Sequence, residues 1–572
     1  EHEPDRPNSL YDPSGSFQNI NRRYDIVYGD VMLNFNYNIR RFDIAATLGW
    51  TGRYENMNNM RVSTNGGLVT ANWFDLNASR YTASSTLQRM ELLKTGYMGT
   101  LSLGWDNYLF LELTGRQERS STLKDQSFFY PSANLSFLFS NAFRMPAWWN
   151  HGKLRLSYGV VGNAPETYAA NIIYEQGSDN GFTWNYVPSS WGNANIRPEK
   201  KYEYEIGFES KFLNNRLGFD VSYYNNRVKD QILSTPQPST SGVKYVLMNV
   251  GEVANEGWDI SVSATPVLTK NFRWDLTANY GIYRNKVVKL ADGVPYLEIS
   301  NIGGGGAKIQ AVEGRPMGDI YVQVPQMNEN GEYLVSDKGL YMNQTELQRV
   351  GNINPDGVGG LFSSFSYKNI FLDFSIDFRI GGDVINEMYQ YSTASGLTPE
   401  SLQFRDTEHG GLSYYYPGNN NASGVPVQVD PSLGAGPNGE TVYHDGVILP
   451  GVVASTGEKN TRIIPAGYYY NQTYNWGTQP EQLTYRHSVF DNSYVKLREL
   501  TIGYQFPEKL ISKLGMTRLS VSVFGRNLFY FYKALKNYDA ESSVGTSWAS
   551  QAVVGGSTTA TRNFGVSLRA SF

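Results

Sequence analysis

The residue types that most often carry catalysis are sparse in this sequence. It contains no cysteine and five histidines, His2, His151, His409, His444 and His487. No pair of histidines has the H-E-x-x-H spacing of a zinc hydrolase, and no serine lies in a G-x-S-x-G nucleophile elbow. The lack of cysteine also removes disulfides, thiol catalysis and cysteine-based metal sites. We therefore expect this chain not to be an enzyme.

Two glycine-containing segments could bind ligands, but neither has a complete motif. Gly303 to Gly306 could hold a phosphate, yet no G-x-x-x-x-G-K-S/T helix opening follows, so we expect a flexible outer loop. The segment GNINPDGVGG, residues 351–360, spaces Asn352, Asn354 and Asp356 loosely as in a calcium loop, without the closing glutamate. The alternative is a simple turn that leads into the next strand. We expect no cofactor, and bound calcium at this loop is left open.

Aromatic side chains are the candidate substrate contacts. They make up 14% of the sequence, which includes 41 tyrosines and 11 tryptophans. Several lie in segments expected to be long outer loops, where flat rings could stack on sugars or clamp a peptide. These candidate substrate-binding residues are Trp184, Trp191, Tyr414, Tyr415, Tyr416, Tyr468, Tyr469, Tyr470 and Trp476. The alternative for each is packing between loops or a place in an aromatic girdle at a membrane interface.

The elements that must position these loops are strands, and the last one has the clearest pattern. In TRNFGVSLRASF, residues 561–572, apolar residues occupy every second position from Phe564 to Phe572. Because the side chains of a strand point alternately to opposite faces, one face is apolar and the other is polar. Such a strand suits a closed outer-membrane barrel, and Phe564 and Phe572 are the candidate C-terminal signal for barrel assembly. The alternative is an edge strand of a soluble sheet.

About fifteen segments share this alternation. They are residues 28–40, 42–50, 91–105, 107–120, 128–141, 153–163, 200–212, 216–233, 255–267, 272–288, 359–368, 371–382, 493–507, 517–530 and 561–572. Short turns alternate with long polar loops, including a polar stretch of about forty residues before residue 91 and an insertion of about a hundred before residue 493. Outer-membrane barrels have short periplasmic turns and long outer loops. The predicted fold class is all-β, a transmembrane antiparallel β-barrel.

Other membrane and repeat folds fit less well. No run of about 18 apolar residues is present, which excludes a helical membrane protein. No repeat of about forty residues supports a soluble glycan-binding propeller. The net charge is −4 with a pI near 5.9 and no basic stripe, so we expect no nucleic-acid partner.

The strand count predicts the domain boundaries. Single-chain barrels have an even number of strands and both termini on the periplasmic side. The last strand ends at that side, so counting back places Tyr28 at the outer end of a strand. We therefore expect residues 1–27 to be an N-terminal extracellular loop segment and residues 28–572 the C-terminal part of a barrel. If the full barrel has 22 strands, about seven early strands are absent. Since EHEPDRPNSLYDPSG has no signal-peptide features, the chain is expected to be processed or part of a longer product.

Several segments resemble a known family. Residues 490–541 contain SYVKLR, LTIGYQFP, GRNL and DAE, which are similar to the S-Y-x-K/R-L-R, L-x-x-G-Y-x-x-P, G-x-N-L and D-x-E motifs that close the SusC-like (RagA-like) TonB-dependent transporters. GEVANEGWDISV, residues 251–262, resembles a strand start of that family, and residues 107–121, 196–225 and 443–460 are also similar. The resemblance covers nearly the whole sequence.

The resemblance implies a function and a set of partners. The family's barrel of 22 strands surrounds an N-terminal plug, lies in the outer membrane of a Gram-negative bacterium and imports glycan or peptide fragments. The implied partners are a SusD-like surface lipoprotein, an N-terminal half with the plug and early strands, the TonB complex acting through that half, and outer-membrane lipid, with a possible dimer of transporter–lid pairs. The plug and the TonB box are not in this sequence. The alternative function is a passive porin or structural barrel.

Overall fold

A computed structural model describes residues 2–3, 14–124, 127–179, 182–238, 240, 242–474, 485–556 and 560–572. Sixteen strands form one sheet in which each strand pairs with the next along the chain. They are β1 (His2–Glu3), β2 (Ser16–Ile39), β3 (Phe42–Leu68), β4 (Ser79–Trp105), β5 (Leu109–Ser120), β6 (Ser127–Phe137), β7 (Trp149–Asn163), β11 (Glu199–Phe212), β12 (Leu217–Lys229), β15 (Glu252–Leu268), β16 (Phe272–Lys289), β22 (Gly357–Tyr367), β23 (Ile370–Ile380), β31 (Tyr494–Gln505), β32 (Arg518–Lys533) and β34 (Asn563–Ser571). Apart from the two-residue β1, these are the fifteen strands that the alternation predicts.

The connections also follow the predicted pattern. Two residues, Arg40 and Arg41, join β2 to β3, and Arg40 adopts a φ of 54°, as tight hairpin turns require. The connection from β31 to β32 contains the predicted short helix, α4 (Glu508–Ile511) with the 3₁₀ turn η8 (Ser512–Leu514), between Pro507 and Gly515. From β7 onward, long connections follow every second strand and contain most of the other small elements, whereas only residues 121–126 join β5 to β6 and α1 (Phe139–Ala142) lies between β6 and β7. Within the described ranges, no helix is both long and apolar enough to span a membrane.

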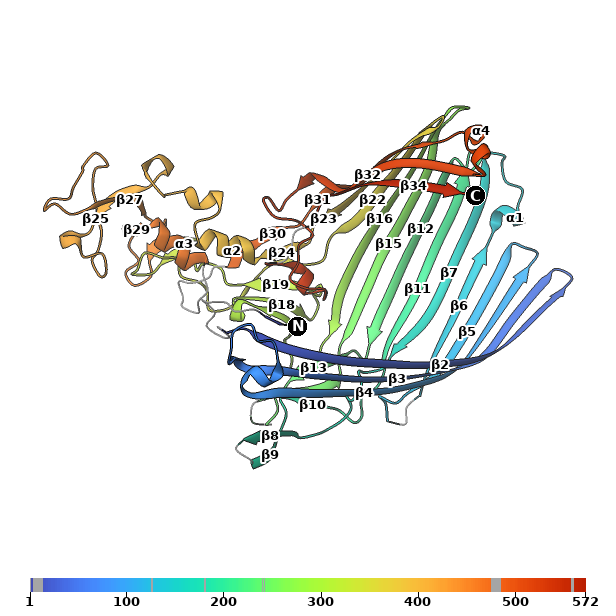
Figure 1. Cartoon of the computed structure of the whole chain (residues 1–572), viewed down its shortest axis with the longest axis horizontal. Helices are drawn as coiled ribbons and strands as arrows, with labels where there is room; N and C mark the ends of the chain where they lie inside the picture. The colour runs from blue at the N-terminus through green and yellow to red at the C-terminus, as the bar shows by residue number, and fades with distance from the viewer. Residues whose placement is uncertain are drawn as a thin grey trace. The chain divides into compact units, whose positions relative to one another are not determined.

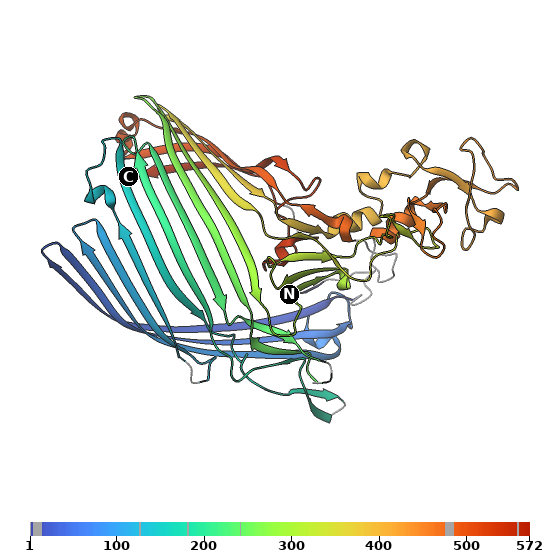
Figure 2. The ribbon, with the colours of Figure 1, turned by 180° about the vertical axis from the view of Figure 1, so that it is seen from behind.

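The chain divides into two compact units. Unit 1 comprises Glu1–Met145, Gly152–Gly207 and Tyr224–Val253, and unit 2 comprises Pro146–His151, Phe208–Tyr223 and Ala254–Phe572. In unit 1, β2, β3 and β4 lie side by side along their whole lengths (Figures 1 and 2). Outside the large sheet, the elements of unit 1 are η1 (Leu76–Ala78), α1 (Phe139–Ala142), the hairpin of β8 (Glu175–Asp179) and β9 (Phe182–Tyr186), and the small sheet of β10 (Ser190–Trp191), β14 (Tyr245–Asn249) and β13 (Ile232–Pro236).

In unit 2, the long connections are built from small sheets and short helices. The sheets are β17 (Tyr296–Ile302), β18 (Ala307–Val312), β19 (Asp319–Val322) and β21 (Gln348–Asn352); β20 (Leu334–Val335) and β28 (Val452–Val453); β30 (Val489–Asp491), β24 (Asp383–Asn386) and β33 (Val553–Val554); and β26 (Val427–Gln428), β25 (Leu412–Tyr415), β27 (Val442–Val447) and β29 (Ile464–Pro465). The helices are α2 (Glu387–Ala394), α3 (Ala466–Tyr474) and the 3₁₀ turns η3 (Gly303–Gly305), η4 (Pro399–Leu402), η5 (Thr407–His409), η6 (Pro417–Asn419), η7 (Tyr485–Ser488) and η9 (Ser550–Ala552). A buried cluster that includes Ile309, Ile320, Ile385 and Tyr485 joins the first and third of these sheets.

The structure differs from the sequence prediction in three stretches. Residues 51–68 and 79–90, expected as a polar loop, continue β3 and β4 in unbroken pairing from Trp50 opposite Tyr97 to Val62 opposite Ser85. Likewise β2 begins at Ser16, so residues 16–27 of the expected loop segment 1–27 are extended strand. The alternation of apolar and polar residues reveals a strand only where one face is apolar. Backbone pairing needs no apolar face, so these strands continue where the pattern ends.

The expected flexible loop at Gly303–Gly306 is also different. It forms η3 next to the fully buried Tyr485, where a Cβ atom on Gly303 would lie 1.6 Å from the tyrosine hydroxyl oxygen. Gly303 has a φ of 58°. Any other side chain here would clash with the tyrosine, so this glycine is required by packing as well as by its backbone conformation.

Candidate functional site

The two faces of the large sheet separate apolar from polar side chains. On β34, Phe564, Val566 and Leu568 are 73, 72 and 68% exposed. The terminal Phe572 is 82% exposed. On β2 the apolar residues Val31, Leu33 and Phe35 are also exposed, whereas Asn34, Asn36 and Asn38 take the alternate positions. The apolar face is the one that a lipid bilayer can cover, and the asparagines then line the interior.

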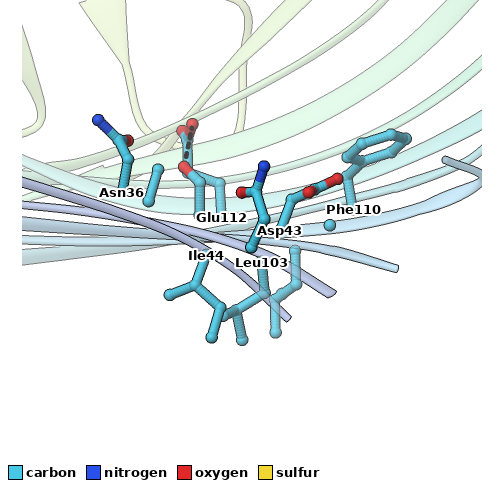
Figure 3. Close-up of a pocket in the computed structure, with 11 residues that line it drawn as sticks. Asn36, Asp43, Ile44, Leu103, Phe110 and Glu112 are labelled. Carbon is cyan, nitrogen blue, oxygen red and sulfur yellow. Dashed lines mark hydrogen bonds between the residues drawn. The ribbon is translucent and has the colours of Figure 1, made fainter. Parts of the chain in front are cut away.

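A pocket of about 480 Å³ lies on the polar face of unit 1, close to the short turns. Asn36, Asp43 and Glu112 point to this face, and Ile44 and Leu103 point to the other (Figure 3). The Glu112 carboxylate accepts hydrogen bonds from Ser102 Oγ at 3.5 Å and from Asn134 Nδ2 at 3.3 Å. The wall here offers carboxylates, amides and a hydroxyl, which bind hydroxylated or cationic groups.

In unit 2 the motifs of residues 490–541 meet on the polar face. Lys496, only 2% exposed, donates a hydrogen bond of 2.5 Å to Glu541. Arg498 donates to both oxygens of Asp377 on β23, through Nε at 3.1 Å and through Nη2, and to both oxygens of Glu541 at 2.9 and 2.5 Å. It also donates to Asn527 Oδ1 at 2.9 Å. We call Asp377, Lys496, Arg498, Asn527 and Glu541 the motif network.

The motif network ties an outer connection to the sheet. Glu541 belongs to residues 534–562, which link β32 to β34, and Asn492 Nδ2 donates to the carbonyl oxygen of Ala540 at 2.9 Å. Burial alone would raise the pKa of the Glu541 carboxyl, but the hydrogen bonds from Arg498 and Lys496 outweigh it and the pKa is lowered. The carboxylate is therefore held ionised between two cations, which is a structural clamp rather than a catalytic arrangement.

The predicted aromatic contacts fall into separate places. In unit 2, Tyr414 on β25 is 2% exposed, stacks on Tyr443 with ring centroids 5.4 Å apart, and donates to Asp445 at 3.0 Å. Tyr470 on α3 is 6% exposed and its hydroxyl donates to the carbonyl oxygen of Glu400 at 2.8 Å. Burial raises the pKa of both hydroxyls. Both rings are buried in packing contacts, and substrate contact by either of them stays a prediction.

The other predicted rings are more accessible. Tyr468 is 36% exposed on α3, and Tyr415, Tyr416 and Tyr469 are half-buried beside their neighbours. In unit 1, Trp184 on β9 is 49% exposed, and Trp191 on β10 packs edge-on against Tyr174 at 5.9 Å. Trp476 lies outside the described residues. Substrate contact by these rings stays a prediction.

Sequence reasoning missed several residues that surround Tyr414 and Tyr470 in unit 2. Tyr443 and Asp445 come from the segment YHDG, and Arg405 and Asp445 line a cavity of about 300 Å³ with Tyr470. The similarity of residues 443–460 to the family was the available signal, because it marked the segment that supplies Tyr443 and Asp445.

The Tyr414 hydrogen bond gives a first testable prediction. We expect Tyr414→Phe to lower the stability of the insertion by about 1 kcal/mol, because the Asp445 carboxylate loses one donor. Tyr468→Phe is the matched control, since Tyr468 is partly exposed. Limited proteolysis between residues 383 and 492 at increasing urea concentration measures the difference. Equal cleavage of the two variants would contradict the packing role.

The candidate calcium loop is engaged in protein contacts. Asn352 Nδ2 donates to the buried Asp319 at 2.9 Å, and Asn354 Nδ2 donates to the carbonyl oxygen of Met317 at 2.6 Å. Asp356 pairs with Arg284 at 3.5 Å. Over the described ranges, no three histidine, aspartate or glutamate side chains gather around a possible metal position. Calcium at this loop stays a prediction.

One serine lies next to a histidine. Ser413 Oγ is 2.8 Å from His444 Nδ1, but Ser413 is 3% exposed. In the part of the chain that the structure describes, no carboxylate forms an ion pair with the His444 ring. A substrate carbonyl could not reach this hydroxyl without unfolding the sheet around it.

The alternating faces, the fifteen membrane-length strands and the sorted loop lengths define an outer-membrane β-barrel. Comparison with known proteins gives the particular family. Residues 2–319 match the family described as TonB dependent receptor-like, beta-barrel, and the chain belongs to it.

Individual relatives support the predicted resemblance. The chain is 22% identical over 494 residues to TonB-dependent receptor P3 of Formosa agariphila, which covers 78% of this chain and 42% of that protein. It is 27% identical to TonB-dependent receptor SusC of Bacteroides thetaiotaomicron over 39% of this chain and 24% of SusC. Its fold is similar to a solved structure of the RagAB peptide transporter, with a TM-score of 0.72, 18% identity, and coverage of 100% of this chain and 58% of that one.

These matches confirm the SusC-like resemblance, the barrel fold class and the outer-membrane location. The chain spans less than half the length of the curated relatives that it matches. A barrel total of 22 strands stays a prediction.

Proposed function

We propose that this chain is the barrel part of an importer of oligomeric nutrients, peptide or glycan fragments, across the outer membrane. The observation that carries the proposal is membership of the TonB-dependent receptor family, with a fold similar over its whole length to a peptide transporter. The polar inner wall of amides and hydroxyls supports passage of a hydrated ligand, and the exposed rings Trp184 and Tyr468 offer stacking surfaces. Import needs no catalytic group, which agrees with the expectation that the chain is not an enzyme.

The proposal includes partners. An N-terminal portion with the plug and early strands would complete the barrel and contact the TonB complex, and a SusD-like surface lipoprotein would cover the long outer connections. A dimer of such transporter–lid pairs is part of the proposal as well. Similarity to SusC and to the RagAB transporter supports these partners.

Uptake measurements distinguish this function from a passive porin or a structural barrel. Cells that carry the complete gene product are incubated with a fluorescent peptide mixture or with labelled glycan fragments. Uptake of each is measured with and without a protonophore. We expect uptake of one ligand class to fall at least about tenfold when the proton-motive force is removed, because each energised cycle depends on it. Uptake that persists would indicate a porin, and no uptake of either class in any condition would indicate a structural barrel.

A further inference from the structure

Strands β3 and β4 are much longer than a membrane requires. Each has 27 residues. Strands tilted by about 40° cross a hydrocarbon band about 25 Å tall in roughly ten residues. Counting from Phe42 next to the short turn, the band ends near Gly52. The remainder of β3 and its partners, residues 16–28 of β2 and 79–94 of β4, therefore extends beyond the hydrocarbon band on the outer side.

The apolar face of these strands continues without a register shift into the extended part. Trp50 and Tyr97 lie opposite one another at the upper part of the band, and the pairing then runs unbroken to Val62 opposite Ser85. Three cross-strand rows follow on the same face: Val27, Tyr54 and Leu93; then Asp25, Asn56 and Glu91; then Arg23, Asn58 and Arg89. Hydrogen bonds from Arg23 Nε to Asp25 at 2.8 Å and from Asn58 Nδ2 to Asn56 at 3.4 Å agree with the last two rows sharing a face.

A third arginine faces the same way at a lower level. Arg119 on β5 pairs with Thr95, one row beyond the pair of Gln117 and Tyr97. Arg89 and Arg119 are exposed, and neither has a salt-bridge partner among the described residues. The Arg23 side chain is 76% exposed, so its pair with Asp25 is weak and can open to another anion. We call Arg23, Arg89 and Arg119 the outward arginines.

We propose that the outward arginines bind phosphate groups of the glycolipid in the outer leaflet of the membrane. The face that carries them is continuous with the lipid-covered face below, so the molecules next to it are the headgroups of the surrounding lipids. Arg119 lies at the edge of the hydrocarbon band. The row of Arg23 and Arg89 is six residues beyond Gly52, on the order of 15 Å higher at this tilt. A guanidinium group matches a phosphate with two parallel hydrogen bonds.

The charge pattern fits phosphates at two heights. The acidic row of Asp25 and Glu91 lies between the levels of Arg119 and of the upper arginines and would repel anions there. A lipid with a single phosphate near its acyl chains could reach only Arg119. A phosphorylated glycolipid with phosphates on its sugars as well could reach both levels, and we assign this class of lipid to the surface.

The opposite face of the same strands supplies a matched control. Arg22, Arg61 and Lys94 lie on β2, β3 and β4 and point inward, since they alternate with the outward rows. The test variant is Arg23→Gln, Arg89→Gln and Arg119→Gln together, and the control is Arg22→Gln, Arg61→Gln and Lys94→Gln. Both lose three positive charges from neighbouring strands of the extended sheet.

The measurement is the amount of phosphorylated glycolipid that co-purifies with the complete protein from outer membranes in mild detergent, per mole of folded protein, by mass spectrometry. We expect the amount of bound glycolipid to fall about tenfold in the outward variant and to change little in the control. The reason is that each of the three exposed arginine–phosphate pairs contributes a fraction of a kcal/mol to binding. Heat-modifiable migration on gels verifies that both variants fold.

Two further outcomes decide the proposal. An equal loss in both variants, or no loss in the outward variant, would overturn it. Rebinding to vesicles of the same glycolipid in phosphatidylcholine, with inorganic phosphate as competitor, identifies the source of the phosphate. Displacement by inorganic phosphate at an equal phosphate concentration would show a simple anion site and would also overturn it. Import by the variants is independent of this result, so the proposed function stands or fails separately.

Discussion

Replacing Glu541 with alanine should lower the free energy of unfolding by about 3 kcal/mol, because it removes one partner of a buried ion pair. Lys496, 2% exposed, would keep its charge without the carboxylate that now lies 2.5 Å from its ammonium nitrogen. Arg498 would lose two of its five hydrogen bonds within the motif network but keep Asp377 and Asn527. Urea unfolding of the protein in detergent micelles, followed by tryptophan fluorescence, measures the change.

The design includes a control and a second readout. Glu508→Ala removes an exposed carboxylate from α4 and should change stability by less than about 0.5 kcal/mol. Limited proteolysis of residues 534–562 reports whether the connection itself has been released. If the two alanine variants unfold at the same urea concentration and the connection stays resistant, the motif network does not clamp it.

The same carboxylate predicts how stability depends on pH. The pKa of Glu541 is lowered in the folded protein, burial notwithstanding, by hydrogen bonds from Arg498 and Lys496. An acid with a lowered folded pKa contributes stability that is fully present above its ordinary pKa near 4.5 and is lost as pH falls through the folded value. We expect wild-type stability to decline below about pH 4.5, and the decline to be smaller in the Glu541→Ala protein.

The strands could be predicted from the sequence because most have one apolar and one polar face. The pattern in residues 371–382 marks β23 within two residues of its ends. It failed for residues 53–63 of β3, where both faces carry polar side chains such as Arg53, Glu55, Asn56 and Asn58. Beyond the bilayer no face needs to be apolar, so the signal disappears although backbone pairing continues.

The candidate site was less predictable, because it depends on contacts between residues distant in the sequence. Arg498 and Asp377 are 121 positions apart and meet only because β23 and β31 are neighbours in the sheet. The motifs around Lys496, Asn527 and Glu541 could be identified in the sequence. That these three residues lie close together in the fold could not be predicted from it. Similarly, nothing in the run of Tyr414, Tyr415 and Tyr416 shows that the first ring is buried against Tyr443.

The assignment of the apolar face to lipid gives the second large prediction. Leu568 lies in the middle of β34 and is 68% exposed, and Leu568→Arg would place a charge in the hydrocarbon region. We expect a loss of about 2–4 kcal/mol in the free energy of unfolding in a bilayer, with less folded protein in the membrane. The neighbouring Ser567 points to the polar face, opposite Ser522.

Ser567→Arg is therefore the matched control, with the same new charge one residue away. We expect it to cost less than about 1 kcal/mol, because its side chain faces the hydrated interior. Equilibrium unfolding of both variants refolded into the same lipid vesicles gives the comparison, and heat-modifiable migration gives the folded fraction. If Ser567→Arg were the more damaging of the two, the faces would be assigned the wrong way round, and the position of the outward arginines would be wrong with them. A clear cost at Leu568 alone would place Phe564 and Val566 against lipid as well, since they alternate with the polar residues of the same strand.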